Sequence, residues 1–229
     1  MPKKLRILII LLLFAALISF YSFFRIRSIE CESQYSVCNS DLRSKLNSLK
    51  VGNISSSKKE IIRFLKNEPV VKKYSIQLKL NGTCLVHIEE RTIKYCVSGN
   101  GNTFYSDVEG IVIKKSNAID EKCIVNSQSE YNLGDKLTDN DMFAQQIFSL
   151  LRNVSDKGKA IINNGILTVE YKANIKLIFP LEGDSRLLAG KTYYIMSQFD
   201  IIKEYIIGKG YKDLSEIDFR FNDPIVRII

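Results

Sequence analysis

An uncharged apolar run near the start of the chain constrains its fold more than any other feature. The run extends from Ile7 to Phe24 and does not recur in the rest of the 229 residues. As a helix it would be about 27 Å long, close to the hydrocarbon thickness of a bilayer. It ends in bulky aromatic residues, whereas a signal peptide ends in small residues at its cleavage site. The sequence therefore favours a retained transmembrane helix at residues 7–24 over a cleaved signal peptide.

Basic residues flank this run on both sides. Three precede it and two follow it: Lys3, Lys4, Arg6, Arg25 and Arg27. Because positive charge is enriched on the cytoplasmic side of membrane helices, the difference favours a cytoplasmic tail at residues 1–6. We expect a single-pass protein of the cell (inner) membrane, with its main body extracytoplasmic, in the periplasm where there is one. The lipid bilayer would then contact residues 7–24.

The overall charge says little about other partners. The chain has 33 basic and 25 acidic residues, and without the five flanking ones 28 basic residues remain against 25 acidic ones. So small and scattered an excess does not indicate binding to nucleic acid.

Five cysteines fit an oxidising compartment. Cys31 and Cys38 are close enough in sequence to form a disulfide, although both could equally be small buried hydrophobic residues. Spacing does not determine any pairing of Cys84, Cys96 and Cys123, and an odd count leaves at least one free thiol. No C-x-x-C pair is present, so a zinc or thioredoxin-like site is not indicated.

Residues 25–91 predict a small domain with the order β-α-α-β-β. An alternating strand leaves the apolar run at residues 24–31, and two amphipathic helices follow, the second starting at a capping box at Ser57. Strands at residues 70–80 and 83–89 then flank Asn81-Gly82, a strong hairpin signal. Two helices between strands favour a layer of helices on a sheet.

Residues 92–229 predict a second domain, an antiparallel β-sheet with flanking helices. Short strands are separated by Gly and Asn, which is typical of antiparallel sheets. A helix is expected after the caps Asp139 to Asp141, and another at residues 191–207. The chain ends in strict alternation at residues 217–221 and an apolar tail, which predicts a strand at the edge of the sheet. The predicted fold class is therefore α+β.

The motifs of enzymes are largely missing. His87 is the sole histidine, which excludes multi-histidine metal sites. The segment from Ser55 to Lys58 matches the S-x-x-K motif, but the partner motifs of that enzyme class are absent. The serines are accounted for by a role in capping a helix. No phosphate-binding glycine motif is present. We expect no catalytic residue, no cofactor, no metal and no small-molecule substrate.

Five segments, in order along the chain, carry a resemblance to a known family. They are Phe24-Arg-Ile-Arg-Ser-Ile29, the stretch from Ile61 through Phe64-Leu65 to Pro69-Val70-Val71 and Tyr74, Leu85-Val-His-Ile-Glu-Glu-Arg91, Phe104-Tyr-Ser-Asp107-Val-Glu-Gly110, and Ile217-Asp-Phe-Arg-Phe221. With the apolar run, they resemble the FtsQ/DivIB cell-division proteins over nearly the whole chain. Two positions depart from that pattern, because Thr92 and Asn81-Gly82 stand where the family usually has proline.

The resemblance implies a bitopic scaffold of the divisome at the septum, with a POTRA domain at residues 25–91 and a β-domain at residues 92–229. Its partners would be other membrane division proteins of the FtsB/FtsL type. The C-terminal edge strand would accept a strand of the partner by β-augmentation, through Phe219, Phe221, Ile225, Val226 and Ile228.

Three alternatives stay open. Both phenylalanines could merely face the core of the β-domain. The chain could also be a POTRA-containing export or assembly component, although it is too short for the membrane barrel that would follow. An anchored extracytoplasmic enzyme would need a convergent polar site.

Overall fold

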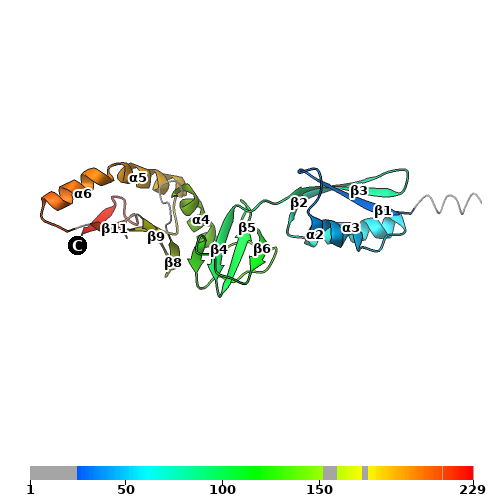
Figure 1. Cartoon of the computed structure of the whole chain (residues 1–229), viewed down its shortest axis with the longest axis horizontal. Coiled ribbons are helices and arrows are strands. Elements are labelled where there is room, and N and C mark those ends of the chain that lie inside the picture. Colours follow the sequence, from blue (N-terminus) through cyan, green and yellow to red (C-terminus); the bar gives the residue numbers. More distant parts are fainter. Residues whose placement is uncertain (1–24, 152–158, 172–174, 213, 229) are drawn as a thin grey trace, which may run out of the picture. The chain divides into compact units, whose positions relative to one another are not determined.

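The computed structural model describes residues 25–151, 159–171, 175–212 and 214–228, and it has an α+β fold (Figure 1). The chain divides into two compact units between Arg91 and Thr92. Each unit has its own sheet and its own hydrophobic core.

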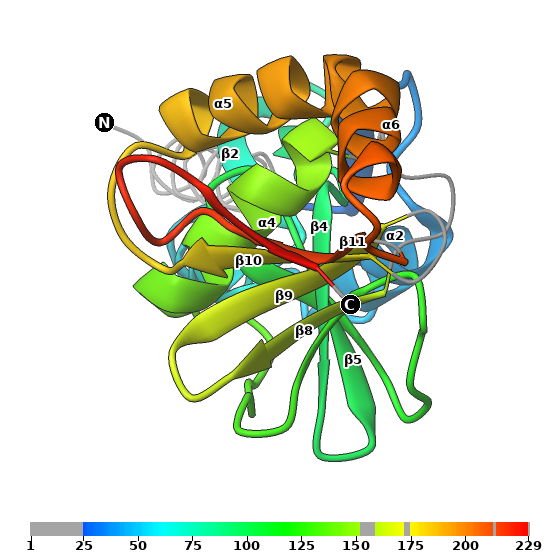
Figure 2. The same ribbon diagram turned by 90° about the vertical axis from the view of Figure 1, so that its left-hand side faces the viewer.

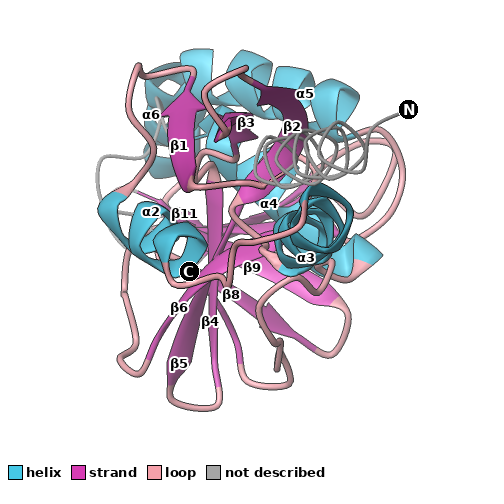
Figure 3. Ribbon diagram, turned by 90° about the vertical axis from the view of Figure 1, so that its right-hand side faces the viewer, coloured by secondary structure: helices cyan, strands magenta, loops and turns pink. Residues whose placement is uncertain are grey.

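The first unit has two helices on one face of a three-stranded sheet (Figure 3). Its elements are β1 (Ser28–Ser33), α2 (Ser40–Asn47), α3 (Ile54–Asn67), β2 (Val71–Leu78) and β3 (Thr83–Glu90). The strand order is β1-β3-β2, with β1 parallel and β2 antiparallel to β3. The helices bury apolar stripes against alternate residues of β3, so that Leu46, Ile61, Leu65, Cys84 and Val86 are almost fully buried.

Local signals account for most of these boundaries. Asn53 caps α3, and its side-chain oxygen accepts the N–H of Ser55 at 2.9 Å. The helix therefore begins one turn before the predicted cap at Ser57, whose hydroxyl instead accepts the N–H of Gly52 at 2.8 Å. The hairpin at Asn81-Gly82 is confirmed, since β2 and β3 are antiparallel and Gly82 has the φ of +84° that such a turn requires.

The second unit contains one nine-stranded sheet, in the order β12-β11-β10-β9-β8-β7-β4-β5-β6. Its strands are β4 (Tyr95–Gly99), β5 (Asn102–Ser106), β6 (Val112–Ser116), β7 (Ile124–Asn126), β8 (Ala160–Asn163), β9 (Ile166–Tyr171), β10 (Ile175–Pro180), β11 (Leu214–Asp218) and β12 (Ile225–Ile228). The prediction of an antiparallel sheet is wrong in part, because the pairs β4–β7, β7–β8 and β10–β11 are parallel.

Three helices cover one face of this sheet: α4 (Asp139–Leu151), α5 (Ser185–Ser197) and α6 (Phe199–Gly208). Figure 2 shows α5 and α6 on the same side of strands β9 to β11. Ile147 of α4, Met196 of α5 and Ile206 of α6 join one core with Leu177 and Ile217 of the sheet. The single helix predicted at residues 191–207 is thus two helices, which are separated at Gln198.

The prediction of a membrane-spanning helix, and of a single-pass location in the membrane, is contradicted. In the described part of the chain no helix is both long enough and apolar enough to cross a bilayer. The longest of these helices, α3, has 14 residues, and its sequence includes the charged residues Lys58, Lys59, Glu60, Arg63 and Lys66. The predicted tail at residues 1–6 and the predicted span at residues 7–24 lie outside the described residues.

The predicted C-terminal strand at residues 217–221 is also corrected. The strand β11 ends at Asp218, and residues 219–224 form the connection that leads to β12. The edge of the sheet is therefore β12 and not the alternating segment that contains Phe219 and Phe221.

Candidate functional site

The edge strand β12 is the first candidate for a functional site. It pairs antiparallel with β11, so that Val226 lies opposite Ile217 and Ile228 opposite Leu214. Within the described residues no strand pairs with the other side of β12. Its outward backbone groups are therefore available to an added strand.

The five residues predicted to bind a partner do not form one surface. Phe219 is only 2% exposed, and its ring stacks on Phe179 with the ring centroids 5.0 Å apart. Phe221, in contrast, is 50% exposed. Phe219, one of the predicted partner-binding residues, therefore belongs to the core, whereas Phe221 is accessible.

The three predicted residues of β12 are exposed: Ile225 to 44%, Val226 to 36% and Ile228 to 37%. Residues directly opposite each other in an antiparallel pair point to the same face. Since Ile217 and Leu214 are buried in the core, their partners Val226 and Ile228 point to the face that the helices cover. A partner strand would thus extend the core of this unit.

A buried ion pair shapes the turn before β12. The carboxylate of Asp218 is fully buried and accepts hydrogen bonds from the Arg220 backbone N–H at 3.1 Å, from Nε at 2.9 Å and from Nη2 at 2.6 Å. The hydrogen bonds from the Arg220 guanidinium hold the pKa of Asp218 below its usual value. The pair explains why the alternation of residues 217–221 does not continue as a strand.

The other sheet edges carry charged side chains or are covered by a neighbouring loop. At the opposite end of the nine-stranded sheet, β6 presents Lys114 and Lys115, and the backbone of Val112 bonds to Gly134 and Asp135 of a neighbouring loop. The edge strand β1 carries exposed glutamates, and β2 carries lysines and a bulge next to Val71. Such charges and covers protect edges against strand addition.

Four of the five cysteines form disulfides. Cys31 and Cys38, the predicted candidates, are joined with their Cα atoms 5.7 Å apart. Cys96 and Cys123 form a second bridge, between β4 and the loop before β7. The free thiol of Cys84 is buried under the helices of the first unit, and burial raises its pKa.

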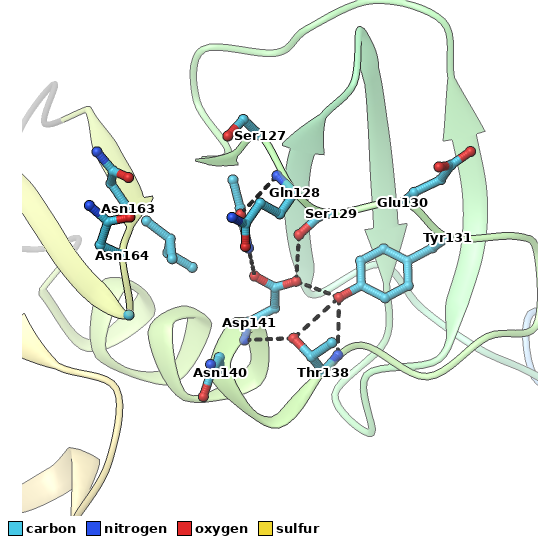
Figure 4. Close-up of a pocket in the computed structure, with 13 residues that line it drawn as sticks. Ser127, Gln128, Ser129, Glu130, Tyr131, Thr138, Asn140, Asp141, Asn163 and Asn164 are labelled. Atoms are coloured by element: carbon cyan, nitrogen blue, oxygen red, sulfur yellow. Dashed lines mark hydrogen bonds between the residues drawn. The ribbon is translucent and has the colours of Figure 1, made fainter.

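A polar pocket of about 280 Å³ is the second candidate. It lies among the loop at residues 126–131, the start of α4 and the turn between β8 and β9 (Figure 4). Asp141 forms part of its wall and is fully buried. One carboxylate oxygen accepts the Asn126 amide at 2.8 Å, and the other accepts Ser129 Oγ at 2.7 Å and the hydroxyl of Tyr131.

These bonds fix the loop against α4. Tyr131 remains a hydrogen-bond donor because burial, together with its bond to Asp141, raises the pKa of its phenol. Thr138 accepts the N–H of Asp141 at 3.2 Å and so caps α4. The predicted caps Asp139 to Asp141 are therefore corrected, because the side chain of Asp141 points into the network instead.

The residues considered for catalysis do not come together. His87 lies on β3 with Nδ1 at 3.2 Å from Glu32 Oε2, and Ser55 lies at the N-terminus of α3. In the part of the chain that the structure describes, no group of three or more acidic, histidine or cysteine side chains could hold a metal ion.

Comparison with known proteins does not assign the chain to a family. No family model matches it, and no curated protein matches it either.

The pocket was missed by reasoning from the sequence. Its residues come from three segments that are distant in the chain, and each segment resembles an ordinary polar loop or cap. One local signal existed, since Asn164-Gly165 is a tight-turn sequence, and both residues have positive φ, at 49° and 73°.

Proposed function

We infer that this protein is a non-catalytic scaffold that binds other proteins, and that β12 takes up a strand from a partner. The observation that carries this inference is the contrast between β12 and the other sheet edges. At β12 three exposed aliphatic side chains lie beside unpaired backbone, and Arg227 is engaged by Glu216, with Nη1 at 2.6 Å from Oε1. A chain that keeps an unprotected apolar edge has a use for it in pairing.

The turn before β12 supports the same function. Because Asp218 and Arg220 hold this turn, β12 is positioned before a partner arrives, which lowers the entropic cost of binding. Val226 and Ile228 point to the helix-covered face of the sheet. Every second side chain of an added strand would point to the same face and could pack against them.

The resemblance to FtsQ/DivIB proteins suggests which assembly this scaffold serves. The order strand, helix, helix, strand, strand of the first unit, with β1 and β2 flanking β3, is compatible with the POTRA domain that the resemblance implies. We place the protein in the cell-division complex, where its partner would be a division protein of the FtsB/FtsL type.

Site-specific crosslinking can test this function. A photoreactive amino acid at Val226 of the full chain, expressed in the native host, should capture a division protein that mass spectrometry identifies. The double variant Ile225→Lys/Ile228→Lys places charge on the edge, as β6 does, and should reduce capture at least tenfold.

The matched control is Ile201→Lys/Ile207→Lys on α6, where both side chains are exposed to more than half of their area. It adds the same charge away from the edge and should leave capture unchanged. Undiminished capture by the folded β12 variant would exclude this edge as the binding site. Capture only of proteins outside cell division would instead refute the assignment to that complex.

A further inference from the structure

The polar pocket beside Asp141 has preformed walls. The amide nitrogen of Asn126 donates a hydrogen bond to Asp141, and its amide oxygen accepts the N–H of Gln128 at 3.2 Å. The parallel pairing of Asn126 with Ile162 fixes the turn at residues 163–165 next to this loop. Side chains at the rim therefore meet a ligand without rearrangement of the backbone.

Carboxamide groups dominate the lining. Five such side chains line the pocket: Asn126, Gln128, Asn140, Asn163 and Asn164. Figure 4 shows Gln128 on one side of the space beside Asp141, and Asn163 and Asn164 on the other side, at the β8–β9 turn. The last four of the five side chains form no side-chain hydrogen bond with any other described residue. Each thus offers a carbonyl oxygen and an amide nitrogen to a ligand.

The charged groups around the pocket determine which class of ligand it favours. No lysine, arginine or histidine lines it, although the chain has 33 lysine and arginine residues. Asp141 forms part of the wall, and its three hydrogen-bond donors are all neutral groups. The negative charges of Asp141 and of Glu130, which also lines the pocket, favour a cation over an anion. Ile162 is the only aliphatic lining residue, which disfavours an apolar ligand.

We propose that this pocket binds the guanidinium or ammonium group of a basic side chain on a bound polypeptide. The carbonyl oxygens of Asn140, Asn163 and Asn164 accept hydrogen bonds from the cationic group, and the field of Asp141 stabilises its charge. The site is independent of β12, because it lies at the loop after β7 and not at the sheet edge.

The first test compares two ligands of nearly the same shape. Nα-acetyl-L-arginine N-methylamide carries the positive charge, whereas the corresponding citrulline derivative is neutral. Titration of the 15N-labelled full chain should shift the side-chain amide signals of Asn163, Asn164 and Gln128 saturably with the arginine derivative. A ligand of this size should have a dissociation constant on the order of 1 mM. The citrulline derivative should bind at least tenfold more weakly.

Two variants then test the position of the site. Asn140→Lys places a positive charge at the rim and should abolish the shifts, and Asn163→Leu, which adds no charge, should weaken binding several-fold. The matched control is Asn47→Lys at the exposed end of α2, which changes the net charge equally and should bind as the unmodified chain does.

Three results would overturn the proposal. They are the absence of saturable shifts at the pocket up to about tenfold above the expected dissociation constant, equal binding of the citrulline derivative, and equal loss of binding in Asn47→Lys and Asn140→Lys.

Discussion

At the scale of single residues, the buried carboxylate of Asp218 links stability to pH. Its pKa is lowered in the folded chain, chiefly by hydrogen bonds from Arg220. A lowered pKa contributes stability above the ordinary aspartate pKa of about 4, and this contribution is lost as the pH falls through the folded value. The unmodified chain should therefore lose stability progressively below about pH 4.

The variant Asp218→Asn should be less stable by about 1–2 kcal/mol at pH 7, because a charge-assisted hydrogen bond is lost while its partner stays in place. Its free energy of unfolding should also depend less on pH in the acid range. Denaturant titrations at pH 7 and pH 3 measure both effects. Asp200→Asn, at an exposed position on α6, serves as the control and should change neither quantity. An unchanged acid dependence in Asp218→Asn would contradict the assigned role.

At the scale of elements, the close approach of β4 to the loop after β7 leaves no room for a side chain. A Cβ atom on Gly99 would lie 2.3 Å from the carbonyl oxygen of Asn126 and 2.5 Å from that of Ser129. Gly99→Ala should therefore force the loop away and cost about 1–3 kcal/mol. Gly190→Ala on α5 meets nothing within 4 Å and should instead stabilise by up to about 1 kcal/mol. Thermal unfolding of both variants checks the contrast, and equal stability of the two would contradict it.

Elements with a local signal were predictable from the sequence. The stripe of Leu42 and Leu46 on α2 and the hairpin at Asn81-Gly82 depend on residues a few positions apart. The parallel pairs β4–β7 and β10–β11 join strands separated by long connections, and no local pattern encodes such pairing. The alternating pattern of residues 217–221 also predicted a strand at Phe219 where there is none, because the hydrogen-bonded pair of Asp218 and Arg220 forms a turn there.

Of the two candidate sites, one could be predicted from the sequence and the other could not. The exposed residues of β12 could be predicted, since an apolar tail after a strand indicates an edge. The pocket could not, because the role of Asp141 depends on Asn126, Ser129 and Tyr131, which precede it by up to 15 positions and meet it only in the folded unit. A polar residue at a helix start is ordinarily a cap, and only tertiary contacts reveal the buried network.

At the scale of the whole molecule, each unit contains one disulfide, and the fifth cysteine, Cys84, is a free thiol. Alkylation of the native full chain should label no cysteine, because Cys84 is fully buried and burial raises its pKa. Unfolding without a reductant should expose that single thiol, and unfolding with a reductant should expose all five. Intact-mass spectrometry counts the labels in each state.

The two bridges should also differ in their effect on stability. In the chain-entropy description, a disulfide stabilises by restricting the unfolded chain, and the effect grows with the length of the closed loop. The bridge between Cys31 and Cys38 spans 7 positions and that between Cys96 and Cys123 spans 27. Their loss should therefore cost about 2.5 and about 3.5 kcal/mol respectively. Denaturant unfolding of Cys31→Ser/Cys38→Ser and of Cys96→Ser/Cys123→Ser measures each cost, with Cys84→Ser as the control that removes no bridge. Three or more labels in the unfolded, unreduced chain would show that one of the bridges does not form.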